Sequence, residues 1–328
     1  MKVRFVDFGK EYLKIRDEIL PEIDRVLSAG DLILRKDLEV FEENFAKLVG
    51  TKYAIGVASG TDALILSLKA LGITGEVIVP SYTFRATVEA IAHAGAIPVL
   101  TDLGEDWKQY KTDKTQAIIP AHIAGEILNW QPIDGIIMIE DYAQAIGAGS
   151  VMGTTACYSF YPAKILGCYG DGGAIATNDQ ELYEKLKILR NHNKGDWKEV
   201  GYNSRLDNLQ AAVLNVKLRH LTHDVERRRE IAMKYDKSLP IELKRPEMRK
   251  IYQDFIVECA SEYERDRMYD FLKNEGVETM KNGYPFPDDF PKLPKASQYE
   301  SVSLRLPCNP SLEDEEVEYV IEKIKEFY

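Results

Sequence analysis

Residues 53–84, YAIGVASGTDALILSLKALGITGEVIVPSYTF, decide the fold class of this chain. The stretch opens with a short apolar run at 53–57, continues with a helical pattern over 61–71, and returns to an apolar run at 77–79 that ends at Pro80. Continuously apolar runs are typical of parallel strands that are covered on both faces. The stretch therefore predicts a strand–helix–strand unit, the building block of an α/β sheet.

The same alternation extends in both directions from this stretch. Further strands are predicted at 97–100, 117–119, 136–139, 156–160 and 173–177, and further helices at 12–29, 37–49, 87–94, 179–190 and 205–237. We expect Asp37 to cap the second of these helices, and the long charged helix to break once near Leu221. Beyond Ser238 the pattern changes to a strand at 252–259 and helices at 262–274 and 312–327, with Ser311 as the cap of the last. The sequence thus predicts a large domain at 1–238 and a small α+β domain at 239–328.

Composition excludes several classes of function. The chain has 328 residues, 53 acidic against 42 basic, and a net charge of −11. This balance argues against a general nucleic-acid binder, which carries a basic face. We see no secretory signal at the start and no apolar run of membrane-spanning length. The 4 cysteines are far apart, which is typical of a reduced, cytoplasmic protein.

Two further groups of side chains were considered as functional sites, one of histidines and one of arginines. His220 and His223 could share a helix face, but no third ligand is evident, so no metal site is expected. The run Arg227-Arg228-Arg229 lies between two glutamates and is interpreted as a solvated face.

The stretch SFYPAKILGCYGDGG at 159–173 places Lys164 after a strand and a proline turn, ahead of a run of glycines. A lysine that is partly desolvated has a lowered pKa and can act as a nucleophile in Schiff-base chemistry. From these residues alone, a surface lysine beside a hairpin turn is the favoured explanation of the pattern.

Other polar groups follow strands. Asp141 ends the apolar run at 136–139, where ligands of open α/β sheets bind, although it could also be a helix N-cap. Ser59-Gly60-Thr61 stands between a strand and a helix, as a phosphate site requires, and ordinary capping is the alternative. Phe84 could stack on a flat ring or belong to the core.

Taken together, these stretches resemble the DegT family of sugar-nucleotide aminotransferases. The resemblance rests on segments in the family's order, which are SGTDAL (59–64), PSYTFRAT (80–87), IIPAHIAGE (118–126), EDYAQAIGA (140–148), SFYPAKILGCYGDGGAI (159–175), LRNHN (189–193), GYNSRLDNLQAAVL (201–214) and LRLPCNPSL (304–312). It implies the aspartate-aminotransferase fold (fold type I), with a three-layer α-β-α domain and a mostly parallel sheet. It also implies pyridoxal 5'-phosphate (PLP) as cofactor.

The resemblance also implies roles for single residues. Lys164 would form the Schiff base with PLP and shuttle the proton, and Asp141 would pair with the pyridine nitrogen. The other implied cofactor contacts are Phe84 on the ring, Gln144 near its hydroxyl, and Gly60, Thr61 and Ser159 on the phosphate. Asn203 would reach the cofactor phosphate of a second subunit, so the working unit would be a homodimer.

The implied reaction moves an amino group from glutamate to a nucleotide-linked keto sugar, and Gln144 favours the C3 position of the sugar. Tyr161, Arg35 and Lys281 are candidates for substrate contact, the last two at positions where the chain departs from the family. Two alternatives remain open at this stage: a regulatory or sensory protein that binds PLP without turnover, and another PLP activity on the same fold.

Overall fold

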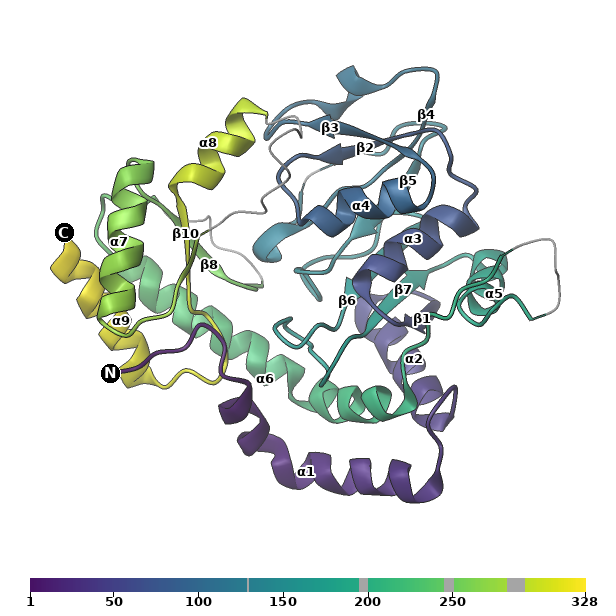
Figure 1. The fold of residues 1–328 in the computed structure, drawn as a ribbon, viewed down its shortest axis with the longest axis horizontal. Coiled ribbons are helices and arrows are strands. Elements are labelled where there is room, and N and C mark those ends of the chain that lie inside the picture. The colour runs from purple at the N-terminus through teal and green to yellow at the C-terminus, as the bar shows by residue number, and fades with distance from the viewer. Residues whose placement is uncertain (129, 195–199, 245–250, 282–292) are drawn as a thin grey trace.

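The computed structural model describes residues 1–128, 130–194, 200–244, 251–281 and 293–328. Its main feature is a seven-stranded sheet with the order β1-β7-β6-β5-β4-β2-β3 (Figure 1). The strands are β1 (Tyr53–Val57), β2 (Glu76–Pro80), β3 (Ile97–Thr101), β4 (Thr115–Ile118), β5 (Ile137–Asp141), β6 (Thr155–Ser159) and β7 (Gly173–Thr177). All pairs among β3, β2, β4, β5 and β6 are parallel, and β7 is antiparallel to β1 and β6. The α/β class and the mostly parallel sheet are therefore confirmed.

Helices cover both faces of this sheet, because successive side chains of its strands point to opposite faces and both faces are apolar. Ile55, Cys157 and Ile175 face one core, which is closed by α3 (Gly60–Ala70), α4 (Arg85–His93) and α5 (Gln180–Leu189). Their neighbours Ala54, Ala156 and Ala174 face a second core against α2 (Lys36–Val49) and α6 (Asn208–Ser238). The result is a helix–sheet–helix sandwich.

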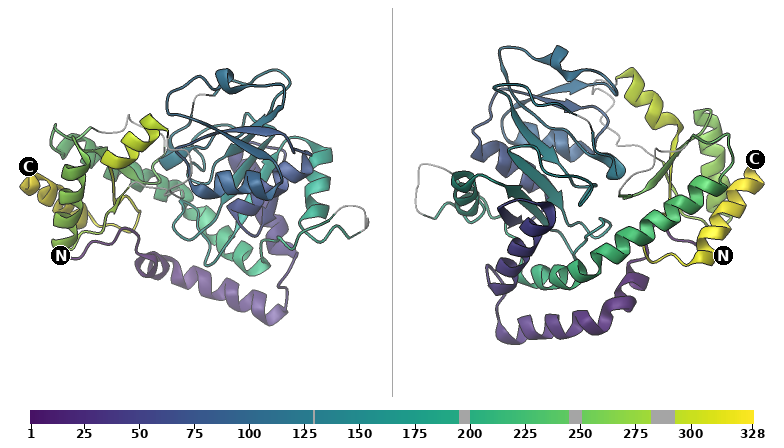
Figure 2. Two further views of the ribbon diagram at one scale, coloured as in Figure 1. Left: turned by 45° about the horizontal axis from the view of Figure 1, so that its top comes forward. Right: turned by 180° about the vertical axis from the view of Figure 1, so that it is seen from behind.

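The helix α6 is continuous over its 31 residues, so the expected break near Leu221 is wrong. Leu221 stays buried in the core and keeps the apolar face intact, and Thr222 lowers helix propensity only slightly. At 1.5 Å per residue the helix is about 46 Å long. Its first half packs against the large sheet, and its second half carries Ile231, Ala232 and Tyr235 into another core (Figure 2).

That other core belongs to a second, three-stranded antiparallel sheet. Its order is β8 (Phe255–Glu258), β10 (Ser303–Leu306), β9 (Met280–Lys281), and it is flanked by α7 (Glu262–Asn274), α8 (Pro294–Val302) and α9 (Asp314–Phe327). The N-terminus joins this unit, since Val3 pairs with Val277, and both termini lie beside it in Figures 1 and 2. The small α+β unit thus follows Ser238 in sequence, and the boundary at 238 stays a prediction.

Two predicted helix caps are wrong. The helix α2 begins at Lys36 with Arg35 in the cap position, and Asp37 is already helical. The last helix is capped by Glu313 in a reciprocal capping box with Glu316, and Ser311 instead bonds Asn309. The first helix, α1 (Phe8–Ala29), starts at the cap Asp7, ahead of the predicted residue 12. None of the helices in the described ranges is long and apolar enough to cross a membrane.

Candidate active site

Four segments that follow strands meet at one edge of the large sheet. The strands β5 and β6 are parallel, so Asp141 and Ser159 end on the same side. Because β7 is antiparallel to both β6 and β1, the strand β1 also points this way and delivers the start of α3. The strand β2, parallel to β4, brings the start of α4 to the same edge. Topology alone thus gathers Gly60, Phe84, Asp141 and Ser159.

Lys164 lies in a tight turn just after β6. Its backbone N–H donates to the Tyr161 carbonyl at 2.8 Å. The turn closes so tightly at Gly167 that an added Cβ would lie 2.3 Å from the Pro162 carbonyl oxygen, so only glycine fits there. Burial lowers the pKa of the Lys164 amine, the carboxylates of Asp254 and Asp141 oppose this shift, and Arg305 adds to it. A lowered pKa increases the fraction of the neutral amine, which is the form that acts as a nucleophile. The Schiff-base role of Lys164 stays a prediction.

Asp141 is a buried carboxylate held from two sides. Its Oδ2 accepts a hydrogen bond from the Thr87 hydroxyl at 2.8 Å, and its Oδ1 accepts one from the Ala143 N–H at 3.0 Å. Thr87 lies in the first turn of α4 and also bonds the Thr83 hydroxyl at 2.9 Å. Asp141 caps a turn, and no helix begins there, so the alternative of a helix N-cap is wrong. A carboxylate can still accept further bonds from a ligand.

A second carboxylate, Glu140, anchors the strand end from the other face. It accepts bonds from the Met152 and Gly153 N–H groups, both at 2.7 Å, and lies 3.4 Å from His122 Nε2. Burial acts to raise the pKa of Glu140, but the bonds from these three groups outweigh it and lower that pKa. The backbone N–H of His122 in turn donates to the backbone carbonyl of Asp141 at 2.9 Å. This network fixes the backbone that carries Asp141.

The start of α3 and the end of β6 form a close cradle. A Cβ on Gly60 would lie 2.7 Å from the Ser159 Cβ, so the two backbones touch. Ser59 caps the helix by accepting the Asp62 N–H at 3.0 Å, which shows that the capping alternative also holds. The helix N-terminus and the Thr61 and Ser159 hydroxyls offer the donors that a phosphate requires.

The structure places the other predicted site residues as follows. Gln144 is buried near Asp141 and accepts the Ala124 N–H at 3.0 Å. Phe84 is the N-cap residue of α4 with half of its surface exposed, at 50%, and Tyr161 is similar, at 53%. Asn203 is exposed and pairs through its backbone with Asn191. The next residue, Ser204, accepts the Ala58 N–H at 3.2 Å and donates to Asp62 at 2.7 Å, so this segment contacts the start of α3.

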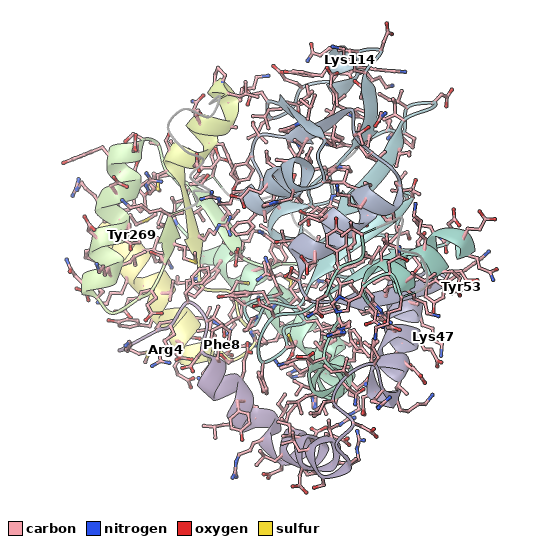
Figure 3. The ribbon with its side chains drawn as sticks, turned by 45° about the vertical axis from the view of Figure 1, so that its right-hand side comes forward. Arg4, Phe8, Lys47, Tyr53, Lys114 and Tyr269 are labelled. Carbon is pink, nitrogen blue, oxygen red and sulfur yellow. The ribbon has the colours of Figure 1, made fainter. Side chains whose placement is uncertain are left out.

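Arg35 and Lys281 lie apart from this cluster within the chain. Arg35 pairs with Asp31 at 3.2 Å and lines a cavity of about 680 Å³ between α2 and α5. Tyr53 and Lys47, which line the same cavity, are labelled at the right of Figure 3. Tyr53 starts β1, so the cavity opens at the edge of the sheet opposite Asp141.

Lys281 is engaged on the second sheet. Its ammonium lies 2.7 Å from an Asp266 carboxylate oxygen and over the ring of Tyr269, which is labelled on α7 in Figure 3. The residues that follow Lys281, up to 292, lie outside the described ranges. The two histidines considered as possible metal ligands contact carboxylates, His220 with Glu18 and His223 with Asp224. Within the described ranges, no group of three or more His, Cys, Asp or Glu side chains is arranged to hold a metal ion.

Sequence reasoning missed the residues that the second sheet contributes. Gln253 bonds the Lys164 turn, and Asp254 pairs with Arg305 at 2.8 Å, both side chains 8% exposed. Gln253 and Asp254 lie in none of the quoted segments, and Arg305 lies in LRLPCNPSL (304–312), where its distance of about 140 residues from Lys164 gave no sign of a role beside that lysine. Arg228 was expected on a solvated face, but it is 4% exposed and donates to the carbonyls of Gln253 and Cys308. Thr87 lies in the segment PSYTFRAT (80–87), and its spacing of four residues from Thr83 could have identified it as a hydrogen-bonding partner at the site.

The donor set fits PLP. A buried carboxylate suits a protonated ring nitrogen, a lysine of lowered pKa suits an aldehyde, and the cradle at Gly60 has room for backbone contact but not for a side chain. These observations stand on the chemistry of this chain alone.

Comparison with known proteins gives the same assignment. The profile of the DegT/DnrJ/EryC1/StrS aminotransferase family matches residues 13–325. A "pleiotropic regulatory protein" of Geobacillus stearothermophilus is 37% identical, over 100% of this chain and 99% of that protein. The dTDP-3-amino-3,4,6-trideoxy-alpha-D-glucose transaminase of Streptomyces venezuelae is 35% identical, over 99% and 96%. The structure of NtdA from Bacillus subtilis with bound cofactor PMP superposes with a TM-score of 0.92 at 27% identity, covering 99% of this chain and 85% of that one. The chain therefore belongs to the DegT/DnrJ/EryC1/StrS aminotransferase family, whose members depend on PLP.

Proposed function

We propose that this protein transfers an amino group from glutamate to the C3 keto carbon of a nucleotide-linked sugar, with PLP as cofactor. The observation that carries the proposal is the convergence of Lys164, Asp141 and the Gly60–Ser159 cradle at one sheet edge. Family membership supports amino transfer, and the name of the S. venezuelae relative supports a 3-amino sugar product. The glutamate donor rests on the family resemblance.

PLP, when bound, supplies an electrophilic carbon and a ring that withdraws electrons. Asp141 would hold the protonated ring nitrogen with the lone pairs that Thr87 and Ala143 leave available. Gly60, Thr61 and Ser159 would bind the phosphate, Phe84 would cover the ring, and Gln144 would lie near the ring hydroxyl. The Lys164 amine, whose pKa burial lowers, would take up and return the proton at its Nζ.

The net charge of −11 gives no attraction for an anionic cofactor or a nucleotide, so binding must be local. The N-terminus of α3 is one such local source. We also propose that Asn203, whose side chain is exposed, completes the phosphate site of a second subunit. Tyr161, with half of its surface exposed beside the Lys164 turn, is our candidate for sugar contact. Arg35 and Lys281 would act on substrate only from a second subunit or after leaving their present carboxylate partners.

The test is to locate the cofactor on the chain. The protein is mixed with PLP and reduced with borohydride, and peptide mass spectrometry then identifies the modified lysine. We expect the label on Lys164 and its loss in Lys164→Ala. Lys217 is the matched control, because burial lowers the pKa of this second lysine as well, yet it lies in α6 over the Tyr169 ring. The proposal is contradicted if the label is found on Lys217, or if the amount of label is unchanged in Lys164→Ala.

A regulatory protein that binds PLP without turnover is the second candidate, and the name of the G. stearothermophilus relative favours testing it. Such a protein would pass the labelling test but would not convert glutamate to its keto acid. Release of 2-oxoglutarate, one per bound cofactor, therefore separates the two candidates.

A further inference from the structure

Gln253 forms a two-point bracket on the backbone of the Lys164 turn. Its side-chain Nε2 donates to the Ala163 carbonyl at 2.7 Å, and its Oε1 accepts the Ile165 N–H at 3.1 Å. These two groups are the peptide neighbours of Lys164 on either side. A single amide therefore fixes the backbone from which the catalytic amine projects. The amide is buried, so both bonds are sheltered from water.

The bracket is itself anchored at the backbone of Gln253. The Gln253 N–H donates to the Ala124 carbonyl at 3.4 Å, and the Ala124 N–H donates to Gln144 Oε1 at 3.0 Å. On its other side, the Gln253 carbonyl accepts the Arg228 guanidinium at 3.0 Å. Gln253 is thus held between α6 and the loop that contacts Gln144.

The packing around this segment leaves little room for movement. Ile251, two residues earlier, packs in the same core as Ile165 of the turn. A Cβ on Gly125 would lie 2.2 Å from the Ile251 carbonyl oxygen, so the loop and the segment touch along their backbones. The conformation of the loop is also unusual, since Ala124 has a φ of 54°. Such a position persists only where the surroundings enforce it.

We propose that Gln253 is a positioning residue for Lys164: it sets the place and the burial of the amine by holding both neighbouring peptide groups. The inference rests on the proposed role of Lys164 for its functional meaning, but its physical content concerns the chain without cofactor. It also gives the second sheet a direct part in the site, because Gln253 leads into β8.

The matched control is Gln210, whose side-chain amide makes a similar two-point contact with the backbone of a single residue, Tyr169. Its Oε1 accepts the Tyr169 N–H and its Nε2 donates to the Tyr169 carbonyl, both at 2.9 Å. Tyr169 lies five residues beyond Lys164 on the same loop. Gln210→Met and Gln253→Met therefore remove equal numbers of bonds from neighbouring stretches of chain, and only Gln253→Met removes them from the peptides flanking Lys164.

Two readouts on the full chain without PLP test the proposal. Acetylation of each lysine, followed by mass spectrometry across a pH series, reports the protonation and access of the Lys164 amine. In Gln253→Met, we expect the Lys164 profile to move to higher pH, since a loosened turn exposes the amine and removes the burial that lowers its pKa. Gln210→Met should keep the wild-type Lys164 profile. An unchanged profile in Gln253→Met, or an equal change in Gln210→Met, overturns the proposal.

Hydrogen exchange of the Ile165 amide is the second readout. Exchange should be roughly tenfold faster in Gln253→Met, as expected for the loss of one sheltered bond. Gln253→Glu keeps the volume and, when the carboxyl is protonated at acidic pH, offers both an acceptor for Ile165 and a donor for the Ala163 carbonyl. Ile165 should therefore stay protected in this variant at acidic pH, and fast exchange there contradicts the bracket even if Gln253→Met does not fold. Neither readout needs PLP. Absence of the borohydride label on Lys164 would therefore refute the proposed function, whereas the bracket is tested only by the acetylation and hydrogen-exchange results.

Discussion

The buried ion pair between Asp254 and Arg305 gives the sharpest prediction about stability. The Arg305 Nη1 lies 2.8 Å from the Asp254 Oδ2, and both side chains are 8% exposed. Asp254→Leu removes the carboxylate and leaves the guanidinium buried. Removal of one partner from such a pair costs about 3–5 kcal/mol, because the remaining charge has lost the partner that compensated its desolvation.

Two comparisons make this prediction specific. The double variant Asp254→Leu/Arg305→Met removes both charges and should recover most of the loss, since apolar side chains of similar volume replace such pairs at little cost. Arg85 and Glu89 form an exposed pair at a comparable 2.6 Å, with side chains 49% and 43% exposed. Glu89→Gln should therefore cost only about 0.3–0.5 kcal/mol.

Urea titration followed by circular dichroism measures the free energy of unfolding of each variant. If Asp254→Leu cost no more than Glu89→Gln, burial would not control the strength of this pair. If the double variant were as unstable as the single one, the pair itself, and not the charge of Arg305 left without the Asp254 carboxylate, would carry the stability. The Lys164 acetylation profile gives a further check, because Asp254 raises the pKa of that amine and its removal should move the profile to lower pH.

Three further outcomes are expected. Lys164→Met should raise the free energy of unfolding of the chain without PLP near neutral pH, because the folded state holds this lysine at a lowered pKa. This increase should shrink as the pH rises through the folded pKa toward 10.5, where both states lose the proton. An increase that grows with pH in urea titrations would contradict the prediction. Gly60→Ala should weaken PLP binding and cost about 1–3 kcal/mol of stability through overlap with Ser159, whereas Gly9→Ala, in an exposed helix with its nearest atom at 3.5 Å, should not destabilise. Thr87→Val should weaken PLP affinity roughly tenfold by removing a hydrogen bond to the charged Asp141, while Thr83→Val leaves that bond in place; equal affinities in a spectroscopic titration would refute the role of Thr87.

Much of the fold could be predicted from the sequence because apolar runs and helix periodicity are local signals. All seven strands of the large sheet coincide with predicted apolar runs to within about two residues, because strands that helices cover on both faces are largely apolar. The predicted caps at Asp37 and Ser311 were wrong because several polar residues near each helix start compete, and only packing decides among them. The break predicted in α6 failed because the tertiary contacts of Leu221 outweigh the weak propensity signal.

The candidate site divides in the same way. Asp141 ends a strand, and Gly60 and Lys164 come within a few residues of strand ends, so their residue types and positions pointed to a ligand. Gln253, Arg305 and Arg228 act across long separations in sequence. Their roles depend on how the second sheet and α6 meet the Lys164 turn, which no local pattern contains. The charge of Arg228 even gave the wrong expectation, since its burial depends on carbonyls from two distant segments.

The central claim is tested most directly by a single-turnover experiment with the glutamate-treated protein. Glutamate should abolish the visible absorption of the PLP-loaded enzyme with release of one 2-oxoglutarate per site. A nucleotide-linked 3-keto sugar should then restore that absorption and yield the 3-amino sugar, and Lys164→Ala should show neither change. Restoration by a 4-keto sugar alone would contradict the proposed position. A protein that binds PLP but releases no 2-oxoglutarate would contradict the proposed glutamate donor and, if no other amino acid serves, the proposed amino transfer itself.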